Sequence, residues 1–174
     1  MEENISYYEN QFIKADTLIG EAKISEAKEL LEELLAQYPD FGKAHNHLAW
    51  IFHMKLSNYE KAFYHYQLAI KFDASYPPSY LNYTYLLVDM AKYSEAKEHI
   101  NKTLGEFENA DKAFYYSELG RIYELEQNFM ESYKYYKNSI SFAFNPQFIE
   151  NMKINMNRVK DKMSIFEKLK LKFI

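Results

Sequence analysis

Histidines and carboxylates are the side chains of this sequence that could bind a metal or transfer a proton. The chain has five histidines and no cysteine, which excludes disulfides, thiolate metal sites and cysteine nucleophiles. His45 and His47 are two residues apart and would point to different sides of a helix, so they do not form a shared metal site. The spacing of Glu29, Glu32 and Glu33 is typical of a solvated helix face with lysines nearby.

The motifs of common catalytic sites do not occur in this sequence. It contains no glycine-rich phosphate loop, no His-Glu-x-x-His metal motif and no nucleophile elbow. We therefore expect no catalytic residue, no metal site and no cofactor, and we predict that the protein is not an enzyme.

A four-residue sequence motif recurs along the chain. Ala27, Ala62 and Ala96 each close a copy of it, at intervals of 35 and 34 residues, and a degenerate copy closes at Ser132 after 36 more. Only four glycines and four prolines are present, which favours long helices joined by short corners. A period of about 34 residues in a helical pattern indicates a solenoid of helical hairpins, each packed on its neighbours.

The residues within each copy resemble the tetratricopeptide repeat. That pattern places a large residue, Leu-Gly and Tyr in a first helix, and Ala, a large residue, Ala and Pro in a second helix. The copies cover about residues 8–41, 42–76, 77–110 and 113–146. The matching residues in the second and fourth copies are His45, Leu48, Ala49, Phe52, Ala62, Tyr66 and Ala69, then Tyr116, Leu119, Gly120, Tyr123, Ser132, Tyr136 and Pro146.

The resemblance implies an all-α fold, a right-handed α-α superhelix (solenoid) of about four helix hairpins with a C-terminal capping helix. Small residues let helices approach where they cross, and large residues fill the space beside them. We expect the small positions at Ala27, Ala49, Ala62, Ala96 and Gly120, and the large ones at Leu48, Tyr66, Leu119 and Tyr136.

The helix boundaries have their own signals. Ser25, Asn58 and Ser94 lie at or near the starts of second helices, where a side-chain oxygen can accept a backbone N–H. Pro77 and Pro146 fall at repeat boundaries, where a helix must stop or begin.

A stripe of apolar residues follows the last copy at helical spacing. It consists of Phe148, Met152, Met156, Val159, Met163 and Phe166. We expect a further helix that starts near Pro146 and could run to Ile174. Residues 1–146 are thus predicted to form the repeat array, and residues 147–174 a C-terminal capping and extension helix that covers the last exposed face.

The resemblance also implies a binding site, because the first helix of each pair lines the concave side in this family. The positions that face this groove, carried onto the present chain, predict a peptide-binding site formed by Phe12, Asp16, Asn46, Trp50, His53, Leu81, Tyr85, Phe114, Ser117 and Arg121, with Lys43, Asn82, Val88 and Glu124 beside them. Tyr, Trp and Arg are the residue types that most often anchor interfaces.

Three of these residues have alternative interpretations, and for Tyr85 packing against its neighbours and contact with a ligand are equally open. Trp50, the only tryptophan, either packs against a neighbouring first helix or contacts a ligand. Arg121 either forms a salt bridge to Glu118 or Glu124 on the same helix or contacts a partner.

A known subclass of the family holds chaperone C-termini with a clamp of Lys, Asn and Arg side chains. The corresponding positions here are Phe12, Asp16, His47, Pro78 and Asn82, and none of them matches the clamp. Binding of a C-terminal carboxylate in that manner is therefore not expected.

Charge and targeting signals limit the choice of partner. Residues 147–174 carry a net charge of +4, which leaves −8 on residues 1–146. An acidic body argues against nucleic-acid binding. The N-terminus lacks a basic region followed by an apolar run, and no apolar stretch approaches the roughly 18 residues that span a bilayer. We expect a cytoplasmic protein, and attachment to a membrane is not favoured.

The sequence therefore predicts a scaffold or adaptor that binds a peptide segment of a protein partner in its concave groove. Two alternatives stay open. One is a secretion-type chaperone for an exported client, and the other is a structural protein that assembles with itself, such as a homodimer formed through the C-terminal helix.

Overall fold

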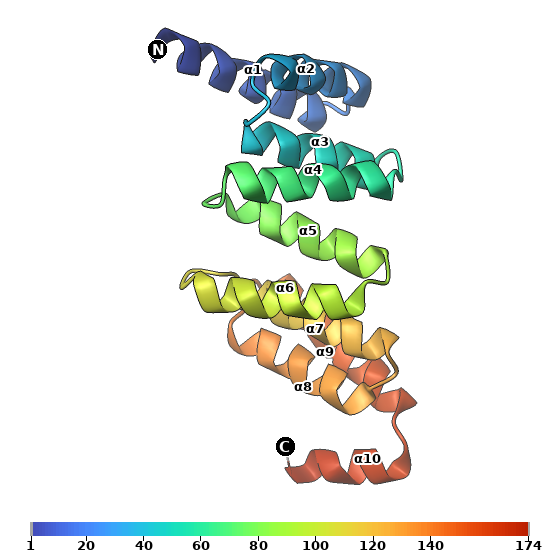
Figure 1. Ribbon diagram of the computed structural model, residues 1–174. Coiled ribbons are helices and arrows are strands. Elements are labelled where there is room, and N and C mark those ends of the chain that lie inside the picture. The colour runs from blue at the N-terminus through green and yellow to red at the C-terminus, as the bar shows by residue number, and fades with distance from the viewer. Residues whose placement is uncertain (1, 174) are drawn as a thin grey trace. The chain divides into compact units, whose positions relative to one another are not determined.

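The computed structural model describes residues 2–173, with side chains described over residues 7–171 and at Phe173. Within that range the chain is all-helical and contains no strand (Figure 1). The helices are α1 (Glu2–Gly20), α2 (Ile24–Gln37), α3 (Gly42–Met54), α4 (Tyr59–Phe72), α5 (Pro77–Asp89), α6 (Tyr93–Glu106), α7 (Lys112–Leu125), α8 (Phe129–Ser141), α9 (Pro146–Lys162), α10 (Ile165–Lys170) and the 3-10 turn η1 (Leu171–Phe173). Each predicted copy holds one pair, from α1–α2 to α7–α8, which confirms the predicted all-α architecture of helix hairpins.

The chain divides into two compact units, Met1–Met90 and Ala91–Ile174. Unit 1 holds α1 to α5, and unit 2 holds α6 to α10 with η1. The division falls in the corner between α5 and α6, inside the third predicted copy. Helix α9 packs on α8 within unit 2, so the segment after residue 146 forms part of that compact unit.

The core follows the alternation of small and large residues that the sequence predicts. Each of these side chains, and the Gly120 position, is buried: Ala27, Ala49, Ala62, Ala96 and Gly120 among the small ones, and Leu48, Tyr66, Leu119 and Tyr136 among the large ones. In unit 1, Ala27, Ala49 and Ala62 lie in one buried cluster with Leu48 and Tyr66, as the repeat pattern predicts.

Gly120 allows helices α7 and α8 of unit 2 to approach each other closely. A Cβ atom added there would lie 2.6 Å from Cδ1 of Tyr136 on the facing helix. Next to it, the Ser132 hydroxyl donates a 2.8 Å hydrogen bond to the Gly120 carbonyl. Ser132 stands where earlier copies have alanine, and its hydroxyl ties α8 to α7 through this bond.

A residue in the left-handed region forms the corner inside every hairpin. These residues are Ala22 (φ 61°), Ser57 (φ 50°), Ala91 (φ 56°) and Gln127 (φ 62°). All four are exposed. Each lies five residues before the small residue of the following helix, so the corner and the second helix recur as one fixed block.

The structure corrects the predicted capping of the second helices. Asn58 caps α4 as expected, since its side chain accepts from the backbone N–H of Lys61. Helices α2 and α6 instead start after Lys23 and Lys92, and neither has a side-chain cap. Ser25 and Ser94 therefore lie inside the first turn. Pro77 and Pro146 occupy first-turn positions of α5 and α9, as predicted.

The C-terminal helix is shorter than its apolar stripe suggested. Met163, with ψ 147°, ends α9, and Ser164 begins α10 with a capping box to Glu167. The expectation of one helix running to Ile174 is therefore wrong over the described residues. Met152, Val159 and Met163 are buried as the stripe predicts, whereas Phe166, beyond the break, is exposed.

Three helices of unit 2 meet at the carboxylate of Glu124, whose side chain is only 10% exposed. Arg158 of α9 donates from Nη2 at 2.6 Å and from Nε at 2.8 Å. Lys162 of α9 donates at 2.9 Å, and the Tyr136 hydroxyl of α8 donates at 3.1 Å. The hydrogen bond from Arg158, supported by Lys162, lowers the pKa of Glu124 to about 2, so the carboxylate stays charged and holds α9 against α7.

None of the helices in the described part of the chain is both long enough and apolar enough to cross a bilayer.

Candidate protein-binding groove

The first helices of unit 1 enclose a cavity of about 250 Å³, which we call the first-helix cavity. It takes residues from α1, α3 and α5, and from the turn before α5. The lining residues are Asp16, Ile19, Asn46, His47, Trp50, Tyr76, Pro78 and Asn82. The i, i+4 spacing of Asn46 with Trp50, and of Pro78 with Asn82, places each pair on one side of its helix.

Polar contacts between successive first helices shape this cavity. The Nδ2 of Asn82 donates to Oδ1 of Asn46 at 3.1 Å. His47 Nε2 lies 3.0 Å from Oδ1 of Asp16, whose side chain is 65% exposed. Burial, with the nearby carboxylate of Asp16, raises the pKa of the Tyr76 hydroxyl. The cavity thus offers a carboxylate, an imidazole and the carboxamide of Asn82 to a ligand, whereas Asn46 is only 2% exposed and accepts from Asn82.

The sequence left open whether Trp50 packs against a neighbouring helix or faces a ligand site, and the structure shows it in contact with both the core and a cavity. It is half-buried against the core of unit 1, and it also lines the first-helix cavity. Its ring lies 5.0 Å from the Nζ of Lys55. The indole therefore packs on its neighbours while part of it stays accessible from the cavity.

The other predicted residues of unit 1 lie around this cavity or away from it. Phe12 packs edge-to-face on His47, with ring centroids 4.6 Å apart. His53 differs from its prediction as a groove residue, because it is 4% exposed and its Nε2 lies 2.9 Å from Oδ2 of Asp89. Leu81 is half-buried, and Tyr85 is exposed.

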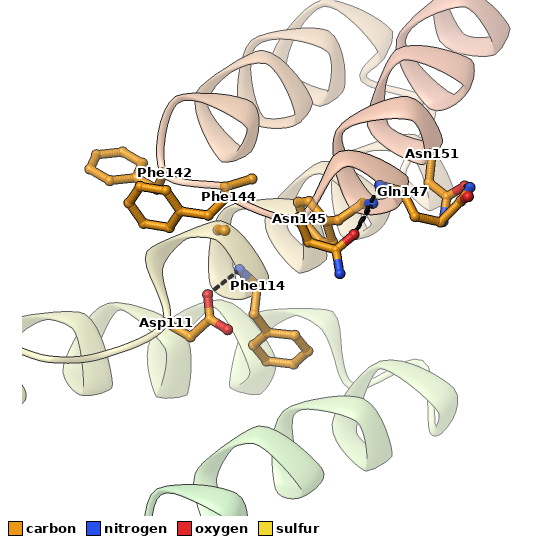
Figure 2. A pocket seen from close by; sticks show the side chains of 10 residues that line it. Asp111, Phe114, Phe142, Phe144, Asn145, Gln147 and Asn151 are labelled. Carbon is orange, nitrogen blue, oxygen red and sulfur yellow. Dashed lines mark hydrogen bonds between the residues drawn. The ribbon is translucent and has the colours of Figure 1, made fainter.

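The predicted residues of unit 2 have separate surroundings on α7. Phe114 lines a cavity of about 400 Å³ beside the aromatic corner of Phe142 and Phe144, as Figure 2 shows. Ser117 is buried, and its hydroxyl donates to the Phe114 carbonyl at 2.7 Å. Arg121 forms the ion pair with Glu118 that the sequence offered as an alternative, at 3.4 Å.

A further cavity of about 520 Å³ opens between the second helices of unit 1, and we call it the α2–α4 cavity. His45 and His65 face each other there, with 2.9 Å between their Nδ1 atoms. The Nε2 of His45 lies 2.9 Å from the Pro39 carbonyl and must donate to it, so its Nδ1 accepts from His65. Burial lowers the pKa of both imidazoles, and His45 helps to bring that of His65 to about 4.

The described residues contain no group of three or more His, Cys, Asp or Glu side chains that could hold a metal ion. The two imidazoles of the His45–His65 pair are hydrogen-bonded to each other and stack on the rings of Phe72 and Phe52.

Sequence reasoning did not include every residue of the first-helix cavity in its predicted site. Ile19 and Tyr76 were missed. His47, Pro78 and Asn82 were considered only as positions of the absent clamp, although Asn82 was also placed beside the groove. Four of the five clamp positions line this one cavity, so the clamp comparison was the signal that could have identified it.

Comparisons with known proteins support the fold. No family model and no curated protein matches the chain. A chain of the APC/C hetero-tetramer Cut9–Hcn1 has a TM-score of 0.75 at 16% identity over 92% of this chain, which spans only 31% of that longer protein. PilF of Pseudomonas aeruginosa gives 0.71 at 16% identity, with 88% of this chain and 73% of that one covered.

A third similar structure is named as a tetratricopeptide-repeat (TPR) protein. It is a thermophilic TPR protein of Thermus thermophilus, with a TM-score of 0.66 at 15% identity, covering 91% of this chain and 84% of that one. The helix hairpins, their period and this similarity together show that the chain has the tetratricopeptide-repeat fold.

Proposed function

We propose that the protein is an interaction module that binds an extended segment of a partner protein in the first-helix cavity. Concave surfaces built from successive repeats are the usual binding surfaces of solenoid proteins. The observation that carries the proposal is the combination of a carboxamide pair, an exposed carboxylate and a partly accessible indole around one cavity.

The chemistry of the lining indicates which segments would bind. The carboxamide of Asn82, held by its hydrogen bond to the buried Asn46, offers a donor and an acceptor, as the backbone of an extended peptide requires. Trp50 offers an aromatic surface for an apolar or cationic side chain. Asp16 favours a lysine or arginine of the partner and disfavours a carboxylate.

This preference for basic segments can be tested on Asp16. Peptides selected from a displayed random library on the native protein should be enriched in Lys and Arg, and their binding should change the fluorescence of Trp50. Asp16→Lys should weaken the selected peptides about tenfold or more, because it places like charges together.

Glu60→Lys provides a matched control, since it makes the same charge change at an exposed position of α4 outside the cavity. It should leave the affinity unchanged, and Asn82→Ala should reduce it. Peptides that bind equally well to the native protein, Asp16→Lys and Asn82→Ala would place the binding site elsewhere.

A further inference from the structure

The last helix of the chain presents an apolar face that is open to solvent. Phe166 is 78% exposed and Phe173 is 90% exposed, and no described residue of α10 is buried. Ile165 and Leu169 add to the same face through their i, i+4 spacing. In Figure 1, α10 lies apart from α8, and the Nζ of Lys168 on α10 donates to the Asp161 carbonyl of α9 at 3.3 Å. Exposed large apolar side chains on one face of a helix mark an interaction surface.

Basic residues border this apolar face. Lys168 and Lys170 lie on either side of it by helical spacing, and Lys172 follows in the sequence. The capping box of Ser164 and Glu167 fixes the start of the helix, so the face is held in a helical conformation before any partner binds. A receptor for it should be an apolar groove with an acidic rim.

The α2–α4 cavity has a largely apolar lining and glutamates along its α2 side. Its floor and walls include the apolar side chains of Leu35, Leu48, Phe52, Tyr64 and Leu68. Its volume of about 520 Å³ lies within the range of about 300–1,000 Å³ that is common for ligand pockets.

The rim of this cavity on α2 is acidic. Glu32 lines it directly and is paired with Lys28 at 2.7 Å, and Glu29 and Glu33 are exposed on neighbouring positions of the same helix. On the α4 side, Lys61 lines the cavity with its Nζ over the Phe52 ring, so the acidic charge is confined to the α2 side. The first copy of the repeat, residues 8–41, is strongly acidic as a whole, and residues 1–41 carry ten acidic and three basic side chains.

We propose that α10 of one copy of the chain docks in the α2–α4 cavity of a second copy. The apolar face enters the cavity, and the lysines face the glutamates of α2. The opposite net charges of residues 1–146 and 147–174, −8 and +4, favour contact between different ends of two copies. The same −8 opposes approach to an anionic membrane, the other surface that would attract a lysine-bordered apolar helix. The proposal is independent of peptide binding, since the first-helix cavity is lined by other residues.

The mass of the full chain in solution tests this contact. Light scattering should show association that grows with concentration and weakens with salt. Phe166→Ser should abolish it, and Ile154→Ser, an exposed apolar position of α9, should not. The pair Lys168→Glu and Lys170→Glu should weaken association about tenfold or more, as should the pair Glu29→Lys and Glu33→Lys.

A charge exchange provides the decisive control. Each charge-reversed protein alone has like charges at the contact between α10 and α2. In a mixture, a contact between one copy of each variant has opposite charges on α10 and α2. Mixing should therefore restore association. A monomer at all concentrations, or association that neither pair of reversals changes, would overturn the proposal. So would a monomeric chain that binds vesicles of anionic lipid and loses that binding with Phe166→Ser, because α10 would then be a membrane helix.

Discussion

Gly120→Ala should destabilise unit 2 by about 1 kcal/mol, although alanine is the better helix former. The added Cβ would lie 2.6 Å from Cδ1 and 2.8 Å from Cε1 of Tyr136, and the Tyr136 ring is only 2% exposed. The ring cannot move without disturbing its contact to Glu124. Overpacking of a filled core costs about 1–3 kcal/mol, which exceeds the gain in helix propensity of roughly 0.5–1 kcal/mol.

The same substitution at Gly105 is the matched control. Gly105 lies on an exposed position of α6, and nothing lies within 4 Å of its added Cβ. Gly105→Ala should therefore raise stability by roughly 0.5–1 kcal/mol. Urea unfolding followed by circular dichroism reports both units, whereas Trp50 fluorescence reports unit 1. Equal effects of the two substitutions would show that Tyr136 does not constrain position 120.

Glu124→Gln is the second change with a large expected effect. It leaves Arg158 and Lys162 without their shared carboxylate. Removal of one partner of a buried ion pair costs about 3–5 kcal/mol, but these two cations are about half exposed and regain contact with water. We therefore expect a loss of about 2 kcal/mol, with α9 exchanging its amide hydrogens faster than α8.

The pH dependence gives this prediction a sign. The folded pKa of Glu124, about 2, lies below the ordinary value of 4.5. The ionised Glu124 therefore contributes fully to the free energy of unfolding above about pH 4.5, and this contribution is lost as the pH falls toward 2. The stability difference between the native protein and Glu124→Gln should shrink over this window. Glu150→Gln, at an exposed pair with Lys153, should change stability little at any pH. A difference that stays constant down to pH 2 would contradict the assigned role of Glu124.

The sequence was most informative where the structure repeats itself. Ala27, Ala62 and Ala96 are each fully buried, so one sequence pattern around a small buried residue could be recognised three times. The break at Ser164 was missed because the apolar spacing continues from Met163 to Phe166 across it. Periodicity alone cannot detect such a break, although the Ser164-x-x-Glu167 capping box was readable.

The candidate site was harder to predict, because it depends on contacts between helices. These contacts nevertheless join residues that are about one repeat length apart in the sequence. Asn46 and Asn82 are 36 residues apart, and Glu124 and Arg158 are 34 apart. Residues one repeat apart become neighbours on adjacent helices, so complementary polar residues at that separation could have been sought. The burial of His53 could not be found in this way without also knowing how its helix is rotated.

The four left-handed corners have a consequence for engineering. L-residues other than glycine are strained there by about 1 kcal/mol or more, and the side chains of Ala22, Ser57, Ala91 and Gln127 are exposed. Glycine at each corner should yield a net gain of about 0.5 kcal/mol after its larger unfolded-state entropy. The natural chain should therefore melt at a lower temperature than the variant with glycine at all four corners, and thermal melting of the two proteins would measure the difference.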